Sequence, residues 1–496
     1  MRRLVFLCNR LLSHQRTMGG GEAMPGFPHP NPIVSYWQLP PHRLAQYRST
    51  EELPTAQTWD YVIIGSGITG AAVTYKLLTR NPTLRIIMLE ARTAASAASG
   101  RNGGHVRAGW HLNFSRNADA FGDEVALAFE RFETDNVADI TDFVRDNAVD
   151  CDFRDVETAD VYTDPAAWAA ALETMRRRKE AMRRRSTDDK SIQHGLAERH
   201  VLEGEAARAR IGLPSAVGAI TYTAHTQNPY KLVCHMLELG LRMGMNLQTN
   251  TMALQVLPPK ACLEGCEVNS ETWTVVTDRG NLTYRRVVLA TNAYTNALHP
   301  QLRQTGFLVP ARSQVSAIRP GSNIENHPVM KDTSVALNDI GLGDYFMVRD
   351  VNLPGAGDIL YGGGRIIHKS LNTVDDSVVN EDVAAYLNHA GFKVFGKGAW
   401  GHEGSSVRDW GGITCYTPDS FPIVGEDTFS YDQKGLWMAI GMNGHGMGLA
   451  FRCAEALVEM MMTGTTPEWL PEPFNLNRVW TQRVRNRETM HRNIYG

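Results

Sequence analysis

The spacing of hydrophobic and polar positions changes several times along the chain, and the first change is the most informative. Residues 61–64 form a short apolar, β-branched run, which is typical of a parallel strand buried on both faces. A helical pattern follows over residues 68–80 and stops at Asn81-Pro82, and residues 84–89 form a second apolar run. This order predicts a parallel βαβ unit.

Similar strand-like and helix-like patterns continue to the C-terminus. Helices are expected at residues 118–147, 166–185, 230–243, 384–394 and 446–462. Strands are expected at 151–162, 246–256, 272–277, 282–291, 309–318, 344–348, 358–361 and 436–440. A strand followed by a glycine turn and a helix occurs near both ends of the body. We therefore predict an α/β plus α+β fold, in which a discontinuous Rossmann-like domain carries an inserted antiparallel β-sheet domain.

The first turn reads Gly65-Ser66-Gly67-Ile68-Thr69-Gly70, and Glu90 follows the second apolar run. The three glycines suit a tight turn, close approach of a pyrophosphate, and close packing of the helix on the strand. The helix N-terminus attracts phosphate, and a carboxylate at the end of the next strand can accept hydrogen bonds from a ribose diol. The unit predicts a site for the ADP half of FAD or NAD.

Two later segments narrow the choice of cofactor. Residues 285–292 form an apolar strand that ends in small polar residues, and residues 436–448 again read as strand, glycine turn and helix. The second helix N-terminus would stabilise the negative charge that reduction places on a flavin ring. Residues 341–344 have two glycines but lack a third glycine and a following helix, so no separate NAD(P)H domain is expected. This favours an oxidase or dehydrogenase over a reductase.

The composition and charge of the chain limit the kinds of partner and site that it can have. The chain has 496 residues and a net charge of −3, which does not indicate binding to nucleic acid or to an anionic membrane. Seven scattered cysteines do not form a disulfide framework, and Cys262 and Cys266 have no partners at zinc spacing, so no metal site is predicted. No apolar run is long enough to span a membrane. The basic run at 176–185 fits a solvated helix face or an anion patch.

The N-terminal region allows three interpretations. Residues 1–23 contain arginines and only one acid, Glu22, so they could be a mitochondrial presequence, a disordered tail, or sequence upstream of a start at Met18 or Met24. A cytoplasmic location is expected, with a mitochondrial one if the segment is a transit peptide.

Several motifs together resemble one family. GSGITGAA, LEAR (89–92), ASGRNGGH (98–105), VVLATNAYT, TPDSFPIVG (417–425) and GMNGHGMG are similar to the D-amino-acid oxidase-like FAD-dependent oxidoreductases. That family includes glycine and sarcosine oxidases and γ-glutamylputrescine oxidase. The tract from Pro25 resembles a fungal branch, and the resemblance covers residues 24–475.

The resemblance implies FAD as the cofactor and a set of residues that bind it. These are Gly65, Ser66, Gly67, Ile68, Thr69, Gly70, Glu90, Ala91, Arg92, Ser99, Gly100, Arg101, Asn102, Gly103, Gly104, His105, Arg107, Ala253, Gly441, Asn443, Gly444, His445, Gly446 and Met447. It also implies a substrate cavity in the β-rich middle, for which the catalytic or substrate-contacting candidates are Tyr345, Arg349, Arg365 and His445.

The implied reaction is oxidation of a C–N bond in an amine or amino-acid derivative. Hydride passes to flavin N5, and O2 reoxidises the flavin and gives H2O2. Two positions depart from sarcosine-oxidase-like members, because Trp110 stands in place of an arginine and Gly448 in place of a lysine, which makes a simple amino acid a poorer candidate. A flavin linked covalently to Cys415 is an alternative to a buried thiol there. Two other functions stay open: a dehydrogenase with a non-oxygen acceptor, and a flavin-binding protein without amine oxidase activity.

The expected organisation follows from these segments. Residues 1–23 are an extension and 24–58 an extended arm. The FAD-binding domain takes 59–160, 226–300 and 406–475. Residues 161–225 are mixed but mainly substrate domain, 301–405 are the substrate-binding β domain, and 476–496 are a tail. A small amine substrate and O2 are the expected partners, and the oligomeric state stays open.

Overall fold

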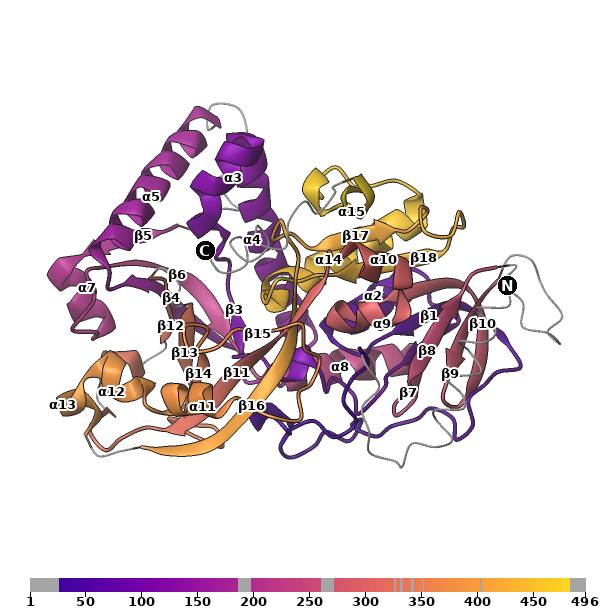
Figure 1. Cartoon of the computed structure of the whole chain (residues 1–496), viewed down its shortest axis with the longest axis horizontal. Helices are drawn as coiled ribbons and strands as arrows, with labels where there is room; N and C mark the ends of the chain where they lie inside the picture. The colour runs from indigo at the N-terminus through magenta and orange to yellow at the C-terminus, as the bar shows by residue number, and fades with distance from the viewer. Residues whose placement is uncertain are drawn as a thin grey trace.

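The computed structural model describes residues 26–185, 198–259, 272–324, 327–330, 333–339, 343–350, 352–401 and 404–481. The predicted extension 1–23, the pair Cys262 and Cys266, and Gly341 lie outside the described residues. Two lobes lie side by side, each built on one large sheet (Figure 1).

The first sheet is the parallel sheet of the predicted Rossmann-like domain. Its central strand is β1 (Thr58–Ile64), paired in parallel with β10 (Gly280–Leu289) and β2 (Ile86–Leu89). The parallel series continues to β18 (Leu436–Ile440) and β7 (Asn246–Gln248), while β17 (Ile423–Glu426) forms an antiparallel edge and β9 (Trp273–Thr277) with β8 (Ala253–Leu257) forms a side branch. Helices α2 (Ile68–Arg80), α8 (Pro229–Arg242) and α14 (Gly446–Thr463) pack beside the strands in one apolar core.

The second sheet is the predicted inserted sheet and has ten strands. Its main path runs β15 (Ser370–Leu371), β11 (Val309–Arg319), β14 (Ile359–Gly363), β13 (Asp344–Val348), β12 (Thr333–Leu337), β4 (Arg154–Tyr162), β6 (Gly218–Thr226) and β3 (His105–Val106). Strand β16 (Ser405–Tyr416) pairs with β11, and β5 (His200–Glu203) pairs with β6. All pairs are antiparallel except β4 with β12. Strands β3, β4 and β16 all belong to this sheet. Residues 105–106, 154–160 and 406–416 of these strands were expected in the FAD-binding segments.

Helices cover the outer parts of the second lobe (Figure 1). They are α3 (Phe114–Phe121), α5 (Pro165–Arg185), α7 (Gly204–Ile211), α11 (Glu381–Asn388), α12 (Ala390–Phe395) and α13 (Lys397–Trp400). Helix α4 (Asp123–Asp146) packs against both α3 and α14 of the first lobe. Short helices α9 (Thr295–Leu298), α10 (Pro300–Thr305) and α15 (Asn477–Thr481) lie on the first lobe. No helix among the described residues is long and apolar enough to cross a membrane.

Two predicted elements are divided in the structure. The strand expected at 246–256 is β7 and β8, separated by a turn in which Asn250 has a φ of 48°. The helix expected at 384–394 is α11 and α12, which are separated by His389, the C-cap of the first and the N-cap of the second. The basic run on α5 is occupied by ion pairs: Arg178 is buried against Glu130 at 2.7 Å. The run is therefore only partly a solvated face.

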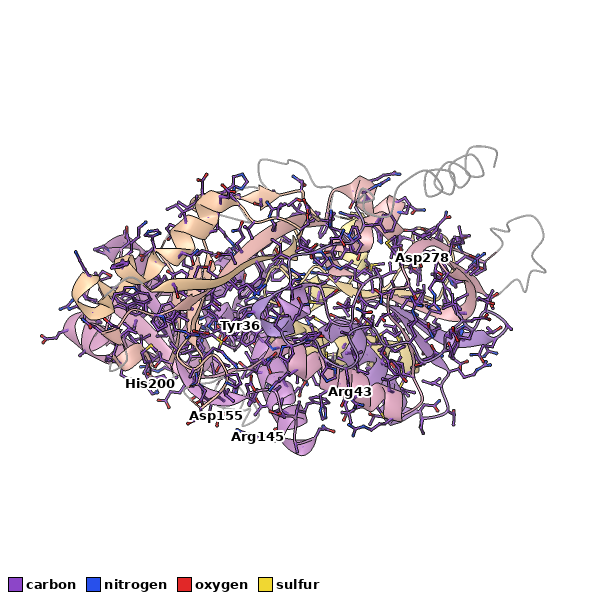
Figure 2. The ribbon with its side chains drawn as sticks, turned by 90° about the horizontal axis from the view of Figure 1, so that it is seen from below. Tyr36, Arg43, Arg145, Asp155, His200 and Asp278 are labelled. Carbon is purple, nitrogen blue, oxygen red and sulfur yellow. The ribbon has the colours of Figure 1, made fainter. Side chains whose placement is uncertain are left out.

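Residues 26–57, the arm, are tied to both lobes. The Tyr36 hydroxyl donates to Asp358 at 3.0 Å on the second lobe, and the Ile33 N–H donates to the Asp376 carbonyl at 2.9 Å. Farther along, the Arg43 side chain donates to Glu238 at 2.7 Å on α8 of the first lobe. Tyr36 and Arg43, labelled in Figure 2, mark how the arm crosses from one lobe to the other.

Candidate functional site

The turn between β1 and α2 is a glycine cradle whose geometry excludes side chains. Gly65 has a φ of 108°, and a Cβ there would lie 2.7 Å from the Ala290 carbonyl oxygen. A Cβ on Gly70 would lie 2.0 Å from the Gly65 carbonyl oxygen, and one on Gly67 would lie 3.0 Å from Ser99 Oγ. The backbone of the turn is thus bare, which leaves room for the pyrophosphate that the motif predicts there.

Glu90 follows β2 and is buried beside this turn. Its Oε2 accepts hydrogen bonds from the Ser66 N–H at 3.1 Å and hydroxyl at 2.6 Å, and its Oε1 accepts from the Arg92 N–H at 3.0 Å. These bonds fix the carboxylate and leave acceptor capacity on both oxygens for the hydroxyls of a ribose.

A cavity of about 300 Å³ begins at this cradle and continues into the second lobe. It brings together twenty of the predicted residues: Gly65, Gly67, Ile68, Thr69, Glu90, Ala91, Arg92, Ser99, Arg101, Asn102, Gly103, His105, Arg107, Ala253, Gly444, His445, Gly446, Met447, Tyr345 and Arg365. The other predicted residues are outside the lining: Ser66, Gly70, Gly100, Gly104, Gly441, Asn443 and Arg349. Most of them belong to the same turns as the lining residues but do not face the cavity.

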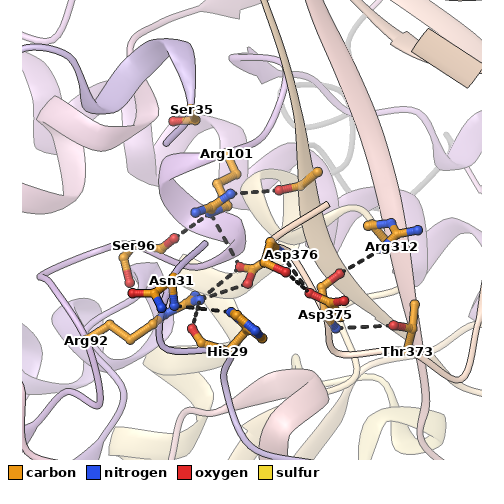
Figure 3. Close-up of polar contacts among 12 residues, drawn as sticks. His29, Asn31, Ser35, Arg92, Ser96, Arg101, Arg312, Thr373, Asp375 and Asp376 are labelled. Atoms are coloured by element: carbon orange, nitrogen blue, oxygen red, sulfur yellow. Dashed lines mark hydrogen bonds and ion pairs between the residues drawn. The ribbon is translucent and has the colours of Figure 1, made fainter. Parts of the chain in front are cut away.

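Two buried arginines with unused hydrogen-bond donors lie in the cavity wall near the cradle. Arg92 and Arg101 are both buried and share one carboxylate, Asp376, at 2.9 and 3.7 Å (Figure 3). Burial lowers the pKa of Arg101 to about 10, so it is still charged at neutral pH. Arg92 Nε and Nη2, Arg101 Nη2 and the Tyr294 hydroxyl are buried and have no hydrogen-bond partner among the described residues. These donors line the cavity and fit an anionic dinucleotide.

At the second-lobe end, His105 and Tyr345 face each other. Their rings are 5.4 Å apart and edge to face, and His105 Nε2 lies 3.2 Å from the Phe346 carbonyl oxygen, to which it donates. Burial, together with the charge of Arg107, lowers the pKa of His105 to about 3. Burial raises the pKa of Tyr345 to about 12. Both side chains are therefore neutral at physiological pH.

Arg107 connects this end of the cavity to a buried polar cluster that the sequence analysis missed. Its guanidinium donates to Asp160 at 2.8 Å, and His111 and Asn338 also contact that carboxylate at 3.3 and 2.8 Å. Burial would raise the pKa of Asp160, but Arg107 and His111 outweigh burial and hold it well below its usual range. The paired carboxylate fixes Arg107 at the cavity wall.

The glycine turn before α14 forms another part of the cavity wall. Asn292, at the end of the strand predicted at 285–292, accepts hydrogen bonds from the Gly441 and Met442 N–H groups at 2.9 and 3.3 Å. The Asn443 side chain accepts from the Thr417 N–H at 2.8 Å. Helix α14 then starts at Gly446, with His445 at its N-cap. The first turn of the helix therefore lines the cavity, where the sequence predicts a contact with the flavin.

His445 has a partner that the sequence analysis did not identify. Its Nε2 is in short contact with Glu133 Oε1, from α4. Glu133 Oε2 accepts a hydrogen bond from the Trp110 N–H at 2.7 Å. Glu133 lies in an amphipathic helix, where an inward-facing acid is the only signal that sequence provides.

Four other candidate residues have distinct environments. Arg365 donates to the Tyr416 hydroxyl at the cavity wall. Arg349 pairs instead with Asp152 at 3.0 Å, away from the lining. Trp110 packs against Phe129, Phe421 and Phe474. The Cys415 side chain is buried in an apolar cluster, and burial raises the pKa of its thiol, although its neighbours 412–414 line the cavity.

The fold and the site define a class: a flavin-dependent oxidoreductase with a Rossmann-like cofactor domain and a β lobe over the far end of the cofactor cavity. The chain belongs to the DAO family of FAD dependent oxidoreductases, whose family model matches residues 60–460. FAD is therefore its cofactor, and the predicted fold class, enzyme class and cofactor are confirmed. No curated protein matches the chain by sequence.

Solved structures share the fold at low sequence identity. Glycine oxidase from Geobacillus kaustophilus has a TM-score of 0.64 at 18% identity, covering 85% of this chain and 99% of that one. L-proline dehydrogenase from P. horikoshii has a TM-score of 0.65 at 19% identity, covering 87% and 100%. Iminodiacetate oxidase from Chelativorans sp. BNC1 has a TM-score of 0.61 at 15% identity, covering 84% and 98%.

Proposed function

We propose that this flavoprotein oxidises the C–N bond of an amine or amino-acid derivative and uses O2 as the electron acceptor, forming H2O2. One observation carries the proposal: the cavity that starts at the glycine cradle ends among polar side chains of the second sheet. Bound FAD supplies the hydride acceptor, and the residues of the second lobe supply the substrate pocket. The names of the fold neighbours, which include glycine, iminodiacetate and L-proline enzymes, are consistent with an amine substrate.

Arg365 is the proposed partner for a substrate carboxylate. It lines the cavity, and its bond to the Tyr416 hydroxyl orients the guanidinium, which suits bidentate binding of a carboxylate. Trp110 and Gly448, where related enzymes carry cations, leave this function to another residue. Arg349 is already paired with Asp152, so we assign it to the support of the lobe.

Tyr345 is proposed to shape the pocket. A Cβ on Gly103 would lie 2.4 Å from its ring, and a Cβ on Gly362 would lie 2.3 Å from it. The two glycines therefore leave the space that the phenol occupies, between the loop of the first lobe and the second sheet. Its neutral hydroxyl can donate a hydrogen bond to a substrate without adding charge.

The test is an anaerobic reduction screen. Purified enzyme is mixed without oxygen with amines, amino acids and their N-methyl and γ-glutamyl derivatives, and the flavin absorbance is followed. We expect bleaching by at least one compound, and rapid return of colour with H2O2 formation when air is admitted. Absence of bleaching by the whole panel would overturn the amine assignment, and bleaching with very slow reoxidation would replace the oxidase by a dehydrogenase.

Arg365→Met refines the test. We expect this variant to need roughly tenfold or more of a carboxylated substrate for half-maximal reduction, since a charged hydrogen bond contributes about 1.5–3 kcal/mol. Simple amines should be unaffected. Arg303→Met, which changes an exposed arginine of α10 that is not part of the cavity lining, is the matched control.

A further inference from the structure

Glu133 is a fully buried carboxylate aimed at a cavity residue. Its exposed fraction is 0%, and it lies in the apolar core with Phe129 and Phe132 of the same helix. A buried charge is stable only with a hydrogen-bonded partner. The Trp110 N–H supplies one partner at 2.7 Å, and His445 Nε2 supplies the other.

The space around His445 is shaped for this contact. A Cβ on Gly448 would lie 2.5 Å from His445 Nε2, so the ring occupies the volume that a side chain would need. One turn along α4, Asn136 donates to the Met447 carbonyl at 2.9 Å and accepts from the Arg452 N–H at 3.0 Å. Two buried residues of α4 therefore fix the start of α14 and the ring at its N-cap.

We propose that His445, held by Glu133, takes the proton from the ammonium group of the substrate before hydride leaves the neighbouring carbon. This inference rests on the proposed function. Because Nε2 is engaged by Glu133, Nδ1 is the nitrogen left for a ligand in the cavity. An N–H bond of the ammonium breaks, its electron pair stays on the amine nitrogen, and the proton bonds to Nδ1. The imidazolium that forms donates Nε2–H to the Glu133 carboxylate.

Three histidines line the cavity, and one of them, His368, is exposed and has its Nδ1 3.0 Å from the Ser370 hydroxyl. The other two, His105 and His445, have opposite environments, and this decides between them. His105 donates Nε2–H to the Phe346 carbonyl and has Arg107 nearby, and its pKa of about 3 prevents it from holding a proton at neutral pH. His445 faces a carboxylate instead. Burial would raise the pKa of Glu133, but His445 and backbone N–H groups lower it, so the carboxylate is charged.

The other charged or titratable side chains near His445 are Arg107, His105 and Arg365. Arg107 is paired with Asp160, and His105 is neutral. On the third side, a Cβ on Gly444 would lie 3.6 Å from Arg365 Nη2, so that guanidinium approaches the same turn. Glu133 is the anion that directly contacts the ring.

The experiment measures anaerobic flavin reduction by a substrate from the screen, from pH ~6 to ~10, for wild type, His445→Gln and Glu133→Gln. We expect both variants to reduce the flavin roughly a hundredfold more slowly at neutral pH, the lower end of what a general base contributes. The loss should disappear once the pH exceeds the pKa of the amine, because the substrate then arrives neutral. Glu130→Gln, a buried acid one turn earlier that pairs with Arg178, should keep the wild-type profile.

A second measurement does not depend on turnover. In protein labelled with 15N-histidine, the chemical shifts should place the His445 ring proton on Nε2, hydrogen-bonded to Glu133, and Glu133→Gln should shift the Nε2 signal. An Nε2 signal that Glu133→Gln leaves unchanged, or a rate loss of equal size at every pH, would overturn the inference. If no amine reduces the wild type, the proposed function fails, and the nitrogen chemical shifts still decide whether the Glu133–His445 pair exists.

Discussion

Replacing Gly448 with alanine places one methyl group where the His445 ring lies. The new Cβ would be 2.5 Å from Nε2, 2.7 Å from Cδ2 and 3.2 Å from the Arg107 carbonyl oxygen. Non-bonded carbon and nitrogen atoms prefer about 3.5 Å or more, so the ring must shift by about 1 Å. Because the carbonyl belongs to the backbone, the ring is the part that moves, and its contact with Glu133 is lost.

The cost follows from leaving a buried carboxylate without one partner. Such a loss destabilises by about 1–3 kcal/mol, and we use this range rather than that of a fully buried ion pair because the His445 side chain is 30% exposed. Alanine also favours the helix by up to about 1 kcal/mol relative to glycine, which would hide part of the loss. Gly446→Ala corrects for this gain, since it lies in the same first turn and its Cβ would meet Met442 at an ordinary 3.6 Å.

The assay compares the unfolding free energies of the two variants in urea, with thermal melting as a check. We expect Gly448→Ala to be less stable than Gly446→Ala by about 1–3 kcal/mol. We also expect its flavin reduction to be slow at neutral pH and to recover at high pH. Equal stability of the two variants would refute the reasoning, because it would show that the His445 ring can move without losing its contact with Glu133.

Three further predictions concern other parts of the cavity wall. Asp376→Asn removes the shared carboxylate of Arg92 and Arg101 and should destabilise the protein by about 3–5 kcal/mol. The melting temperature should fall more in the protein without FAD than in the protein with FAD, and equal falls would contradict this account. His105 should make stability fall as pH falls from 6.5 towards 3, by about 1.4 kcal/mol per pH unit, because the unfolded chain binds a proton there that the folded one does not. His105→Gln should remove that slope in urea titrations at several pH values, and an unchanged slope would show that another group is responsible. The Cys415 thiol should resist a thiol reagent until the protein unfolds, and all flavin should leave the denatured chain; flavin that stays on the precipitate would indicate a covalent link.

The parts that sequence predicted well depend on neighbours in the chain. The βαβ unit was visible because its strand, turn, helix and acid follow one another, and α2 has the predicted bounds, Ile68–Arg80. The glycine turn before α14 was visible for the same reason. Strand β16 was not predicted, because its first residues are exposed and carry no alternating pattern.

The parts that sequence missed depend on contacts between distant segments. Glu133 and His445 are 312 residues apart, and Arg107 follows β3 whereas Asp160 lies in β4. Arg349 was a reasonable candidate by position, but Asp152 is its partner, and only the sheet brings these two side chains together. Local pattern identifies residues that could line a cavity, while the pairing that sets their charge is a property of the whole fold.

The arm is synthesised before every segment on which it rests. Tyr36 bonds to Asp358 across 322 residues, and at about 5–20 residues per second the ribosome needs tens of seconds to cover that distance. Phe27 and Pro28 line the cavity, so its wall is incomplete during this interval. The glycine cradle and Glu90 are complete long before then. The nascent chain therefore contains the glycine turn and Glu90 early, whereas the walls formed by the arm and by residues 444–448 are completed late. Until then, cofactor can enter from those sides.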